Sequence, residues 1–450
     1  MKLALIGGGG VRAPLFVQSA LRRAERIGLS EIVLMDIDAG QLETIGALCR
    51  ELCRRTGNAV AVSTTTSTEE AFRDARYVVT TVRPGGVEGR IADERIALAQ
   101  DVLGQETTGA GGFAMALRSI PTILDYARQL REISPDAWLF NFTNPAGLVT
   151  QALSDAGFER CVGICDSANG AQSAVARWLG VEERAVETDV FGLNHLSFSR
   201  EARVEGRDRL PEALADDGFL ASTALKVFEP AVVRRHGMWI NEYLYYYYYA
   251  DRAVADLKAG ETRGEEVQVL NRALMARLSE IDVRRNPAAA LEAYFAYEHR
   301  RSATYMQHAN HDEVDDEPAA TEPDGEGYAG VALSLIEALE GGPALRTGLN
   351  VRNGGAISGL RDGDVVEVSC RVDAAGIHPV PVGEMPEAQS YLVQSVKHYE
   401  RLTVEAVRQK SRALAVEALV AHPLVLSYSR AEPLVENYLA AHRDYVGEWR

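Results

Sequence analysis

The segment KLALIGGGG, residues 2–10, decides how the chain begins to fold. A short apolar run ends in Gly7, Gly8, Gly9 and Gly10, and a helical pattern starts near Pro14. Glycine at such a turn lets the backbone approach a pyrophosphate, and the following helix supplies N–H donors and a positive dipole end. The segment therefore predicts a strand, a nucleotide-binding turn and a helix.

The next apolar run, EIVLMDID at 31–38, specifies which dinucleotide the turn binds. It ends in Asp36, placed to accept hydrogen bonds from a ribose diol, and an acidic residue there disfavours the 2′-phosphate of NADP. The third glycine position of the usual G-x-G-x-x-G pattern is Arg12, so a plain tight turn is the alternative. With the β-α-β context and Asp36, NAD binding is the prediction.

Apolar runs and amphipathic stretches alternate over the first 165 residues. Helical patterns lie between the runs, for example at 14–26 and 41–55. This rhythm is typical of a doubly wound parallel sheet, so we expect an α/β, Rossmann-like NAD-binding domain over residues 1–168. The runs interpreted as buried strands are KLALIG, EIVLMDID, AVAVSTTT, YVVTTV, WLFNFT and CVGIC.

After Asn169 the pattern changes. Residues 187–205 alternate like antiparallel strands, and helical patterns follow at about 265–283 and 387–420. We expect a C-terminal α+β domain over residues 169–450 that binds substrate and metal and supports oligomerisation. The acidic stretch 312–326 predicts a solvated loop, with a lid as the less favoured alternative.

The composition limits the partners and the compartment. The net charge is −17 and no basic block stands out, which argues against nucleic acid and anionic membranes as partners. The five cysteines are scattered, so a disulfide framework is not expected. Met1 runs directly into the first strand and there is no apolar run of 18 residues, which predicts a cytoplasmic enzyme.

Three downstream segments carry chemically useful side chains. NFTNPAG, at 141–147, follows a predicted strand, where ligands bind in open α/β sheets. GICD ends in Cys165 and Asp166, and FGLNH ends in Asn194 and His195. A cysteine thiolate and a neutral imidazole can share one divalent ion. Taken alone, a core cysteine and a structural histidine are the favoured interpretation of this pair.

Taken together with further segments, the chain resembles glycoside hydrolase family 4, the NAD-dependent glycosidases. NFTNPAG and GLNH are the most specific of these segments, which follow the family's order from position 1 to about 370. The others are VRPGGVEGRIADERIAL, DVLGQETTGAGGFAMALRSIPTI, GICD, NEYLYYYYY and NVRNGGAI.

The resemblance implies a redox route to glycoside cleavage. NAD would take a hydride from C3 of the sugar, and a divalent metal held by Cys165 and His195, usually manganese, would acidify the C2 proton. Tyr243 matches the family's base, and Asp166 matches a proposed acid or base. Elimination, hydration and reduction by the same NADH would complete the cycle. The family also suggests a homodimer or a homotetramer.

The resemblance also implies the residues that hold substrate and cofactor. Asn144 and Asn194 would bind sugar hydroxyls, Asn144 also lying against the cofactor. Arg90 matches a family contact to an anionic substituent, and we assign Arg12 and Arg352 to the substrate as well.

The sequence departs from the family where that anion is bound. Most members hydrolyse 6-phosphoglycosides and carry hydroxyl residues in the first turn, where this chain has Gly10, Val11 and Arg12. A second, basic element is replaced by the acidic segment 324–327. Because a sulfonate carries one negative charge, we weakly favour 6-sulfo-glucosides (sulfoquinovosides) as substrates, with 6-phospho-glucosides as the alternative. A contact of Arg12 with a nearby carboxylate or with the cofactor is the other interpretation of that residue.

Two other functions use the same NAD scaffold. A hydroxy-acid dehydrogenase would release its ketone product and accumulate NADH, but the sequence lacks the His and Arg arrangement typical of that class. A non-enzymatic NAD sensor would have no use for Cys165, His195 and Tyr243 together.

Overall fold

The computed structural model describes residues 1–306, 309 and 327–450, and the fold is described over these residues. The predicted acidic loop at 312–326 therefore lies outside the described residues, as does most of the segment 324–327.

A nine-stranded sheet runs through the molecule in the order β3-β2-β1-β4-β5-β6-β11-β12-β13. Strands β1 to β6 pair in parallel, and β11, β12 and β13 continue the sheet in antiparallel fashion. The order 3-2-1-4-5-6 is that of a dinucleotide-binding fold. The strands are β1 (Lys2–Ile6), β2 (Glu31–Met35), β3 (Ala61–Thr65), β4 (Ala75–Thr80), β5 (Trp138–Asn141), β6 (Cys161–Gly163), β11 (Leu345–Arg352), β12 (Val365–Asp373) and β13 (Gly376–Pro379).

The helices between these strands make the sheet doubly wound, as predicted. The chain moves in one direction from β1 to β3 and in the other from β4 to β6, so right-handed connections place their helices on opposite faces. Helices α1 and α3 pack together on one side, and α6 and α7 pack together on the other. The helices are α1 (Ala13–Arg22), α2 (Ala24–Ile27), α3 (Ala39–Thr56), α4 (Thr68–Phe72), α5 (Gly86–Leu98), α6 (Gly109–Ile133), α7 (Ala146–Asp155) and α8 (Gly170–Leu179).

Each apolar run named as a strand forms one, but β3 differs from the prediction in its burial. Its residues are exposed or half-buried, because β3 is the last strand at its edge of the sheet and has one neighbour, β2. The β-branched residues that predicted a buried strand here reflect strand propensity alone.

The predicted antiparallel strands form a smaller sheet beside the large one. It contains β7 (Val186–Leu193), β8 (Leu196–Val204) and β10 (Trp239–Ile240), and β9 (Arg207–Asp208) pairs with β8. Strand β7 also packs against β12 of the large sheet, which joins the two sheets.

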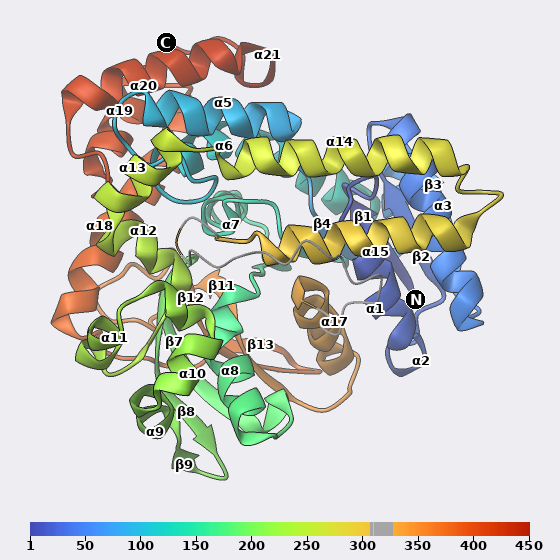
Figure 1. The fold of residues 1–450 in the computed structure, drawn as a ribbon, viewed down its shortest axis with the longest axis horizontal. Coiled ribbons are helices and arrows are strands. Elements are labelled where there is room, and N and C mark those ends of the chain that lie inside the picture. The colour runs from blue at the N-terminus through green and yellow to red at the C-terminus, as the bar shows by residue number, and fades with distance from the viewer. Residues whose placement is uncertain (307–308, 310–326) are drawn as a thin grey trace.

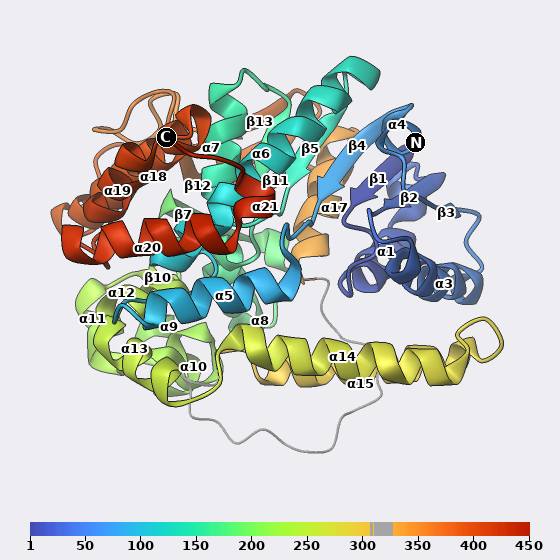
Figure 2. The ribbon, with the colours of Figure 1, turned by 90° about the horizontal axis from the view of Figure 1, so that it is seen from above.

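Most of the remaining chain is helical. The predicted helix at 265–283 is α14 (Arg263–Ile281), whereas the predicted helix at 387–420 breaks at Lys410, which has a left-handed backbone, into α18 (Glu387–Gln409) and α19 (Arg412–Ala421). Helices α14 and α15 form a long pair below the NAD-domain strands in Figure 2. The other helices are α9 (Leu210–Ala215), α10 (Asp217–Ser222), α11 (Pro230–His236), α12 (Tyr245–Tyr248), α13 (Ala250–Ala259), α15 (Pro287–Ala303), α17 (Gly327–Leu339), α20 (Tyr428–Ala441) and α21 (Arg443–Val446).

The predicted division at 168/169 falls shortly after β6. Figure 1 shows that β11, β12 and β13, from the second predicted domain, lie beside the first one's strands, so a single core crosses that division. The two-domain description stays a prediction. All five cysteines are free. No helix in the described part of the chain is both long and apolar enough to cross a membrane.

Candidate active site

The candidate site lies at the carboxyl ends of the parallel strands, the edge at which open α/β sheets bind ligands. The glycine turn follows β1, Asp36 follows β2, Arg83 follows β4, Asn144 follows β5, and Cys165 follows β6. Residues up to 158 positions apart in sequence thus share one edge of the sheet because each begins a loop after a strand.

The glycine turn is shaped for a pyrophosphate. Gly7 has a left-handed φ of 90°, and a Cβ on Gly8 would lie 2.7 Å from the Leu34 side chain, so neither position accepts a larger residue without strain. The Gly9 N–H donates to the Asp36 carboxylate at 3.0 Å, which fixes the turn against β2. Arg12 caps α1 without a side-chain hydrogen bond to its first N–H groups. The residues present fit an NAD pyrophosphate at the helix start and a ribose beside Asp36.

Cys165 and His195 meet at this edge from different sheets. Cys165 follows β6, and His195 lies in the tight turn between β7 and β8 with a left-handed φ of 61°. The Cys165 Sγ atom is 3.2 Å from His195 Nε2 and 3.1 Å from the Ser167 hydroxyl. The turn that places His195 under backbone strain also aims its ring at the thiol.

The hydrogen bonds of Thr107 identify which ring nitrogen of His195 carries a proton. The Thr107 hydroxyl donates to the Gln105 side-chain carbonyl at 2.7 Å and lies 2.6 Å from His195 Nδ1. With its proton used on Gln105, the hydroxyl accepts from Nδ1–H. The lone pair of Nε2 then points toward Cys165, as metal binding requires.

The pair fits a divalent metal. Burial lowers the pKa of His195 to about 4, so the imidazole is neutral, and burial raises the pKa of the Cys165 thiol well above its usual value. Bonds of about 2.3 Å to sulfur and about 2.1 Å to nitrogen, meeting at about 90°, separate the two ligand atoms by about 3.1 Å. No cluster of three or more His, Cys, Asp or Glu suited to a metal occurs in the described part of the chain. The two ligands therefore leave positions open for substrate and water.

Tyr243 packs directly on the metal pair. Its ring stacks on His195 with centroids 3.7 Å apart and an angle of 7°, and its N–H is held by the Asn241 side chain at 3.0 Å. Burial raises the pKa of Tyr243 well above its usual value, while a hydrogen bond donated by Tyr305 opposes that shift. A tyrosine base in this position therefore needs nearby positive charge to lose its proton.

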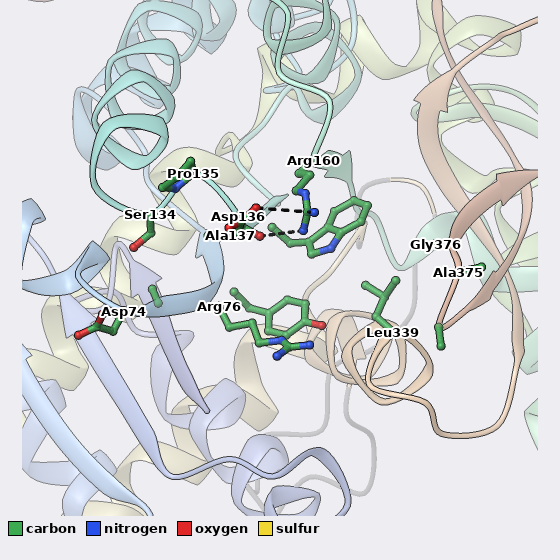
Figure 3. A pocket seen from close by; sticks show the side chains of 14 residues that line it. Asp74, Arg76, Ser134, Pro135, Asp136, Ala137, Arg160, Leu339, Ala375 and Gly376 are labelled. Atoms are coloured by element: carbon green, nitrogen blue, oxygen red, sulfur yellow. Dashed lines mark hydrogen bonds and ion pairs between the residues drawn. The ribbon is translucent and has the colours of Figure 1, made fainter.

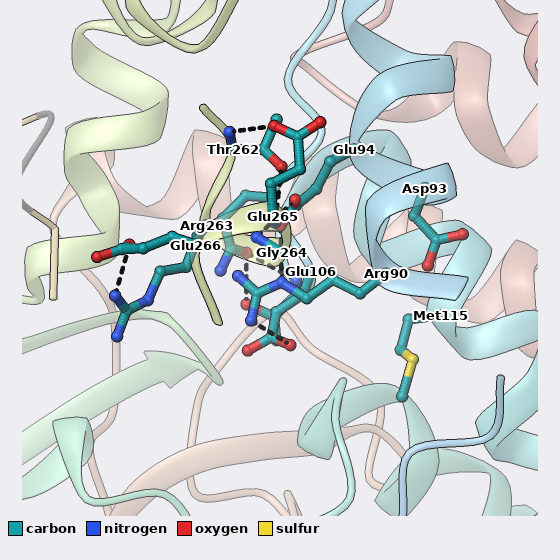
Figure 4. Close-up of polar contacts among 12 residues, drawn as sticks. Arg90, Asp93, Glu94, Glu106, Met115, Thr262, Arg263, Gly264, Glu265 and Glu266 are labelled. Carbon is teal, nitrogen blue, oxygen red and sulfur yellow. Dashed lines mark hydrogen bonds and ion pairs between the residues drawn. The ribbon is translucent and has the colours of Figure 1, made fainter. Parts of the chain in front are cut away.

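A network of buried arginines and carboxylates forms the other end of the site (Figure 4). Arg90 donates to Glu94 at 2.7 Å and pairs with Glu106 at 3.1 Å, and Glu94 in turn accepts from the Gly264 N–H at 2.9 Å. Arg83 also pairs with Glu106. Burial opposes ionisation of Glu106, but Arg83, Arg90 and then Arg12 hold its pKa well below the usual range.

The other predicted residues fall at different distances from this centre. Asp166 lies beside Cys165, with an Oδ1–Sγ distance of 3.9 Å, and Asn194 donates to Glu367 at 3.2 Å. Asn144 begins the turn into α7, just past the end of β5. Arg352 is exposed at the end of β11, near Asp155 and Gly363. Its place in the substrate site stays a prediction.

Sequence reasoning missed several members of the site. Glu106 and Thr107 lie in GQETTGAGG, which carried the family resemblance but received no roles. An acid and a hydroxyl directly before a glycine pair were the available signal. Glu367, which accepts hydrogen bonds from Asn194 and Asn350, lies within β12 and had no local signal.

A surface cavity of about 740 Å³ is a separate feature at the opposite edge of the sheet (Figure 3). Arg76, Tyr77, Trp138 and Arg160 line it, at the starts of β4, β5 and β6. Arg160 donates to the Asp136 carbonyl at 2.9 Å. None of the predicted site residues lines this cavity, so it is not the candidate site.

Known proteins match the chain along nearly its whole length. A probable 6-phospho-beta-glucosidase of Bacillus subtilis is 29% identical over 459 residues, covering 100% of this chain and 98% of that protein. The 6-phospho-beta-glucosidase BglT of Thermotoga maritima is 30% identical over 448 residues, covering 99% of each.

Solved structures agree. A Thermotoga maritima 6-phospho-beta glucosidase with manganese, NAD+ and glucose-6-phosphate superposes with a TM-score of 0.82 at 29% identity, covering 99% of both chains. A 6-phospho-alpha-glucosidase from gut microorganisms, in complex with NAD and Mn2+, gives a TM-score of 0.81 at 25% identity, covering 100% of this chain and 99% of that one. The expected mixed α/β architecture is confirmed by these structures. Residues 2–181 match the family 4 glycosyl hydrolase domain and residues 190–425 match its C-terminal domain, so the chain belongs to family 4 of the glycosyl hydrolases.

Proposed function

We propose that this chain is an NAD-dependent 6-phospho-glucosidase that also uses a divalent metal, manganese in the first instance. One observation carries the proposal: Cys165, His195 and Tyr243 are in mutual contact beside the glycine turn, with Nε2 of His195 3.2 Å from the thiol sulfur. A hydrolase that relied on two carboxylates flanking the scissile bond would not need this arrangement.

The residues of this chain divide the chemistry between them. When bound, NAD supplies redox chemistry at a sugar carbon and the metal supplies Lewis acidity. Cys165 and His195 hold the metal, and Thr107 keeps His195 in the tautomer that can bind it. Once C3 carries a carbonyl, the C2 proton is acidic enough for the Tyr243 oxygen to remove it.

Proton transfer to the departing group and positioning of the sugar fall to neighbouring residues. Asp166, beside Cys165, exchanges a proton with the leaving oxygen or with water. Asn194 and Asn144 hold sugar hydroxyls, and the glycine turn with Asp36 holds the cofactor. Arg90 and Arg12 lie at the end of the site where an anionic substituent binds.

The relatives favour a phosphate over the sulfonate expected from the sequence. Those compared above are named as 6-phospho-glucosidases, and one was solved with glucose-6-phosphate. The first turn nevertheless lacks hydroxyl residues, so arginine donors replace them in recognising the phosphate. We propose further that the chain assembles as a homodimer or homotetramer, which light scattering on the purified protein measures.

A substrate screen tests the proposal. Nitrophenyl α- and β-glucosides with 6-phosphate, 6-sulfonate or 6-hydroxyl groups are incubated with the NAD- and manganese-loaded protein. We expect the highest kcat/KM on a 6-phospho-glucoside, loss of turnover when NAD is removed, and no net accumulation of NADH. A preference for the 6-sulfo substrate would restore the sulfonate assignment, and steady NADH accumulation would indicate a dehydrogenase.

A further inference from the structure

Helix α15 closes the glycine turn from above, although nothing in the sequence assigned it to the site. The Tyr294 hydroxyl donates to the backbone carbonyl of Val11 at 2.8 Å, next to Arg12. Glu298 and Arg301 follow Tyr294 by four and seven positions, so they lie on the same face of the helix. That face therefore points toward the side chain of Arg12.

Arg301 is held rigidly at this position. Arg263 donates to the Arg301 carbonyl at 2.7 Å and to the Thr304 hydroxyl at 2.6 Å, which fixes the end of α15. The Arg301 side chain is 14% exposed and lies 3.8 Å from the Glu298 carboxylate, whose Oε1 has no hydrogen-bond partner. The guanidinium therefore has a defined position but only a loose counter-charge.

Charges in the described part of the site are balanced at one end and not at the other. Arg83 and Arg90 face Glu94 and Glu106, two cations against two anions. Arg12 and Arg301 face each other with Glu298 between them.

The pKa directions agree with a surplus of positive charge around Arg12. Burial lowers the pKa of Arg301, and the nearby positive charge of Arg12 lowers it further. Burial also raises the pKa of Glu298, which weakens the one carboxylate between the two arginines. An anion bound between the two guanidinium groups would remove their repulsion.

We propose that Arg301 determines specificity by binding the anionic C6 group of the substrate together with Arg12. The inference rests on the proposed function, because it names the side chains that recognise the phosphate. The guanidinium fork presents parallel N–H donors that match phosphate oxygens, so two arginines replace the hydroxyl donors absent from the first turn. Glu298 sets how much positive charge the pair presents.

Substitutions of α15 test this assignment. Arg301→Gln should lower kcat/KM on the nitrophenyl 6-phospho-glucoside by about 10- to 100-fold, the effect of losing charge-assisted hydrogen bonds, with little change on the unphosphorylated glucoside. Arg301→Lys should be intermediate because it keeps the charge without the fork. Glu298→Gln should raise the preference for the phosphorylated substrate. Arg300→Gln, at the exposed neighbouring position, is the matched control and should leave the ratio unchanged.

Binding of inorganic phosphate to the NAD-loaded protein, measured by calorimetry, separates this inference from the proposed function. If the wild-type protein cleaves no 6-phospho-glucoside but Arg301→Gln still weakens phosphate binding by about tenfold or more, the inference stands and the proposed function fails. Unchanged phosphate affinity and an unchanged substrate ratio in a folded Arg301→Gln protein would overturn the inference. Where that variant does not fold, Glu298→Gln decides, and an unaltered phosphate Kd in it counts against the assignment.

Discussion

The two ends of the candidate site are built in different ways. At the metal end, Cys165 and His195 come from loops directly after strands, 30 residues apart, and touch at 3.2 Å. At the anion end, Arg12 comes from the first turn and Arg301 from a helix 289 residues later. The metal end has a fixed geometry, whereas the anion end combines a fixed buried network with two arginines that share one carboxylate. Chemistry and substrate preference are thus carried by separable parts of the fold.

The largest effect should come from the metal ligands. Cys165→Ser and His195→Ala each remove one of two protein ligands, so bound metal and turnover should both fall to background. Chelator treatment of the wild type should have the same effect, and added manganese should reverse it there alone. Metal content by elemental analysis, alongside turnover, makes the measurement. Either variant with wild-type turnover after chelation would show that the pair is merely structural.

The next effect concerns the proposed base. Tyr243→Phe keeps the ring stacked on His195 but removes the hydroxyl, so the protein should fold while turnover falls by about 10²- to 10⁴-fold. Metal content should remain at the wild-type level, which distinguishes this variant from the ligand variants. Tyr245→Phe, in the same tyrosine run but buried away from His195, is the control. Equal turnover in the two variants would move the base to Asp166.

A smaller effect at the metal end should come from Thr107. Thr107→Val removes the oxygen that accepts from Nδ1 of His195, so the ring loses its fixed tautomer and metal affinity should fall by about 10- to 100-fold. Thr107→Ser retains the hydroxyl and should restore the affinity. Titration of the metal-free proteins with manganese measures both. The same affinity in Thr107→Val and the wild type contradicts the tautomer assignment.

The smallest effect should appear at the anion end, in Arg12. Arg12 is exposed, so Arg12→Ala should fold normally and lower the preference for a 6-phospho-glucoside over the plain glucoside by about tenfold. Arg26→Ala removes a surface arginine near the same helix, paired only with Glu337 at 3.5 Å, and should change nothing. Ratios of kcat/KM measure the preference. A ratio left intact in Arg12→Ala would place the anion elsewhere.

The metal end could be predicted from sequence because its residues follow strand ends within short motifs. GICD and FGLNH each place a functional side chain one or two residues past a predicted strand, and the sheet order then brings the strand ends together. The β-α-β rhythm of the first 165 residues predicted six strands, and only the burial of β3 was wrong, because strand propensity does not reveal an edge position.

The anion end was only partly predictable. Arg12 and Arg90 lie in recognised segments, but their electrostatic partners depend on tertiary contacts of elements far apart in sequence. Glu298 and Arg301 lie within an ordinary amphipathic helix, and only its packing over Val11 brings them to the site. Likewise, Glu367 is one residue of a buried strand, and no local pattern distinguishes it from a core position.

Incorporation of deuterium at C2 of the sugar product tests the central claim of redox-assisted cleavage most directly. The NAD- and manganese-loaded protein cleaves a nitrophenyl 6-phospho-glucoside in heavy water, and the product is read by NMR. Removal of the C2 proton by Tyr243 followed by return of a solvent proton predicts deuterium at C2, and substrate deuterated at C2 or C3 should react more slowly. Product that carries no deuterium at C2, formed without an isotope effect at either carbon, would contradict the account.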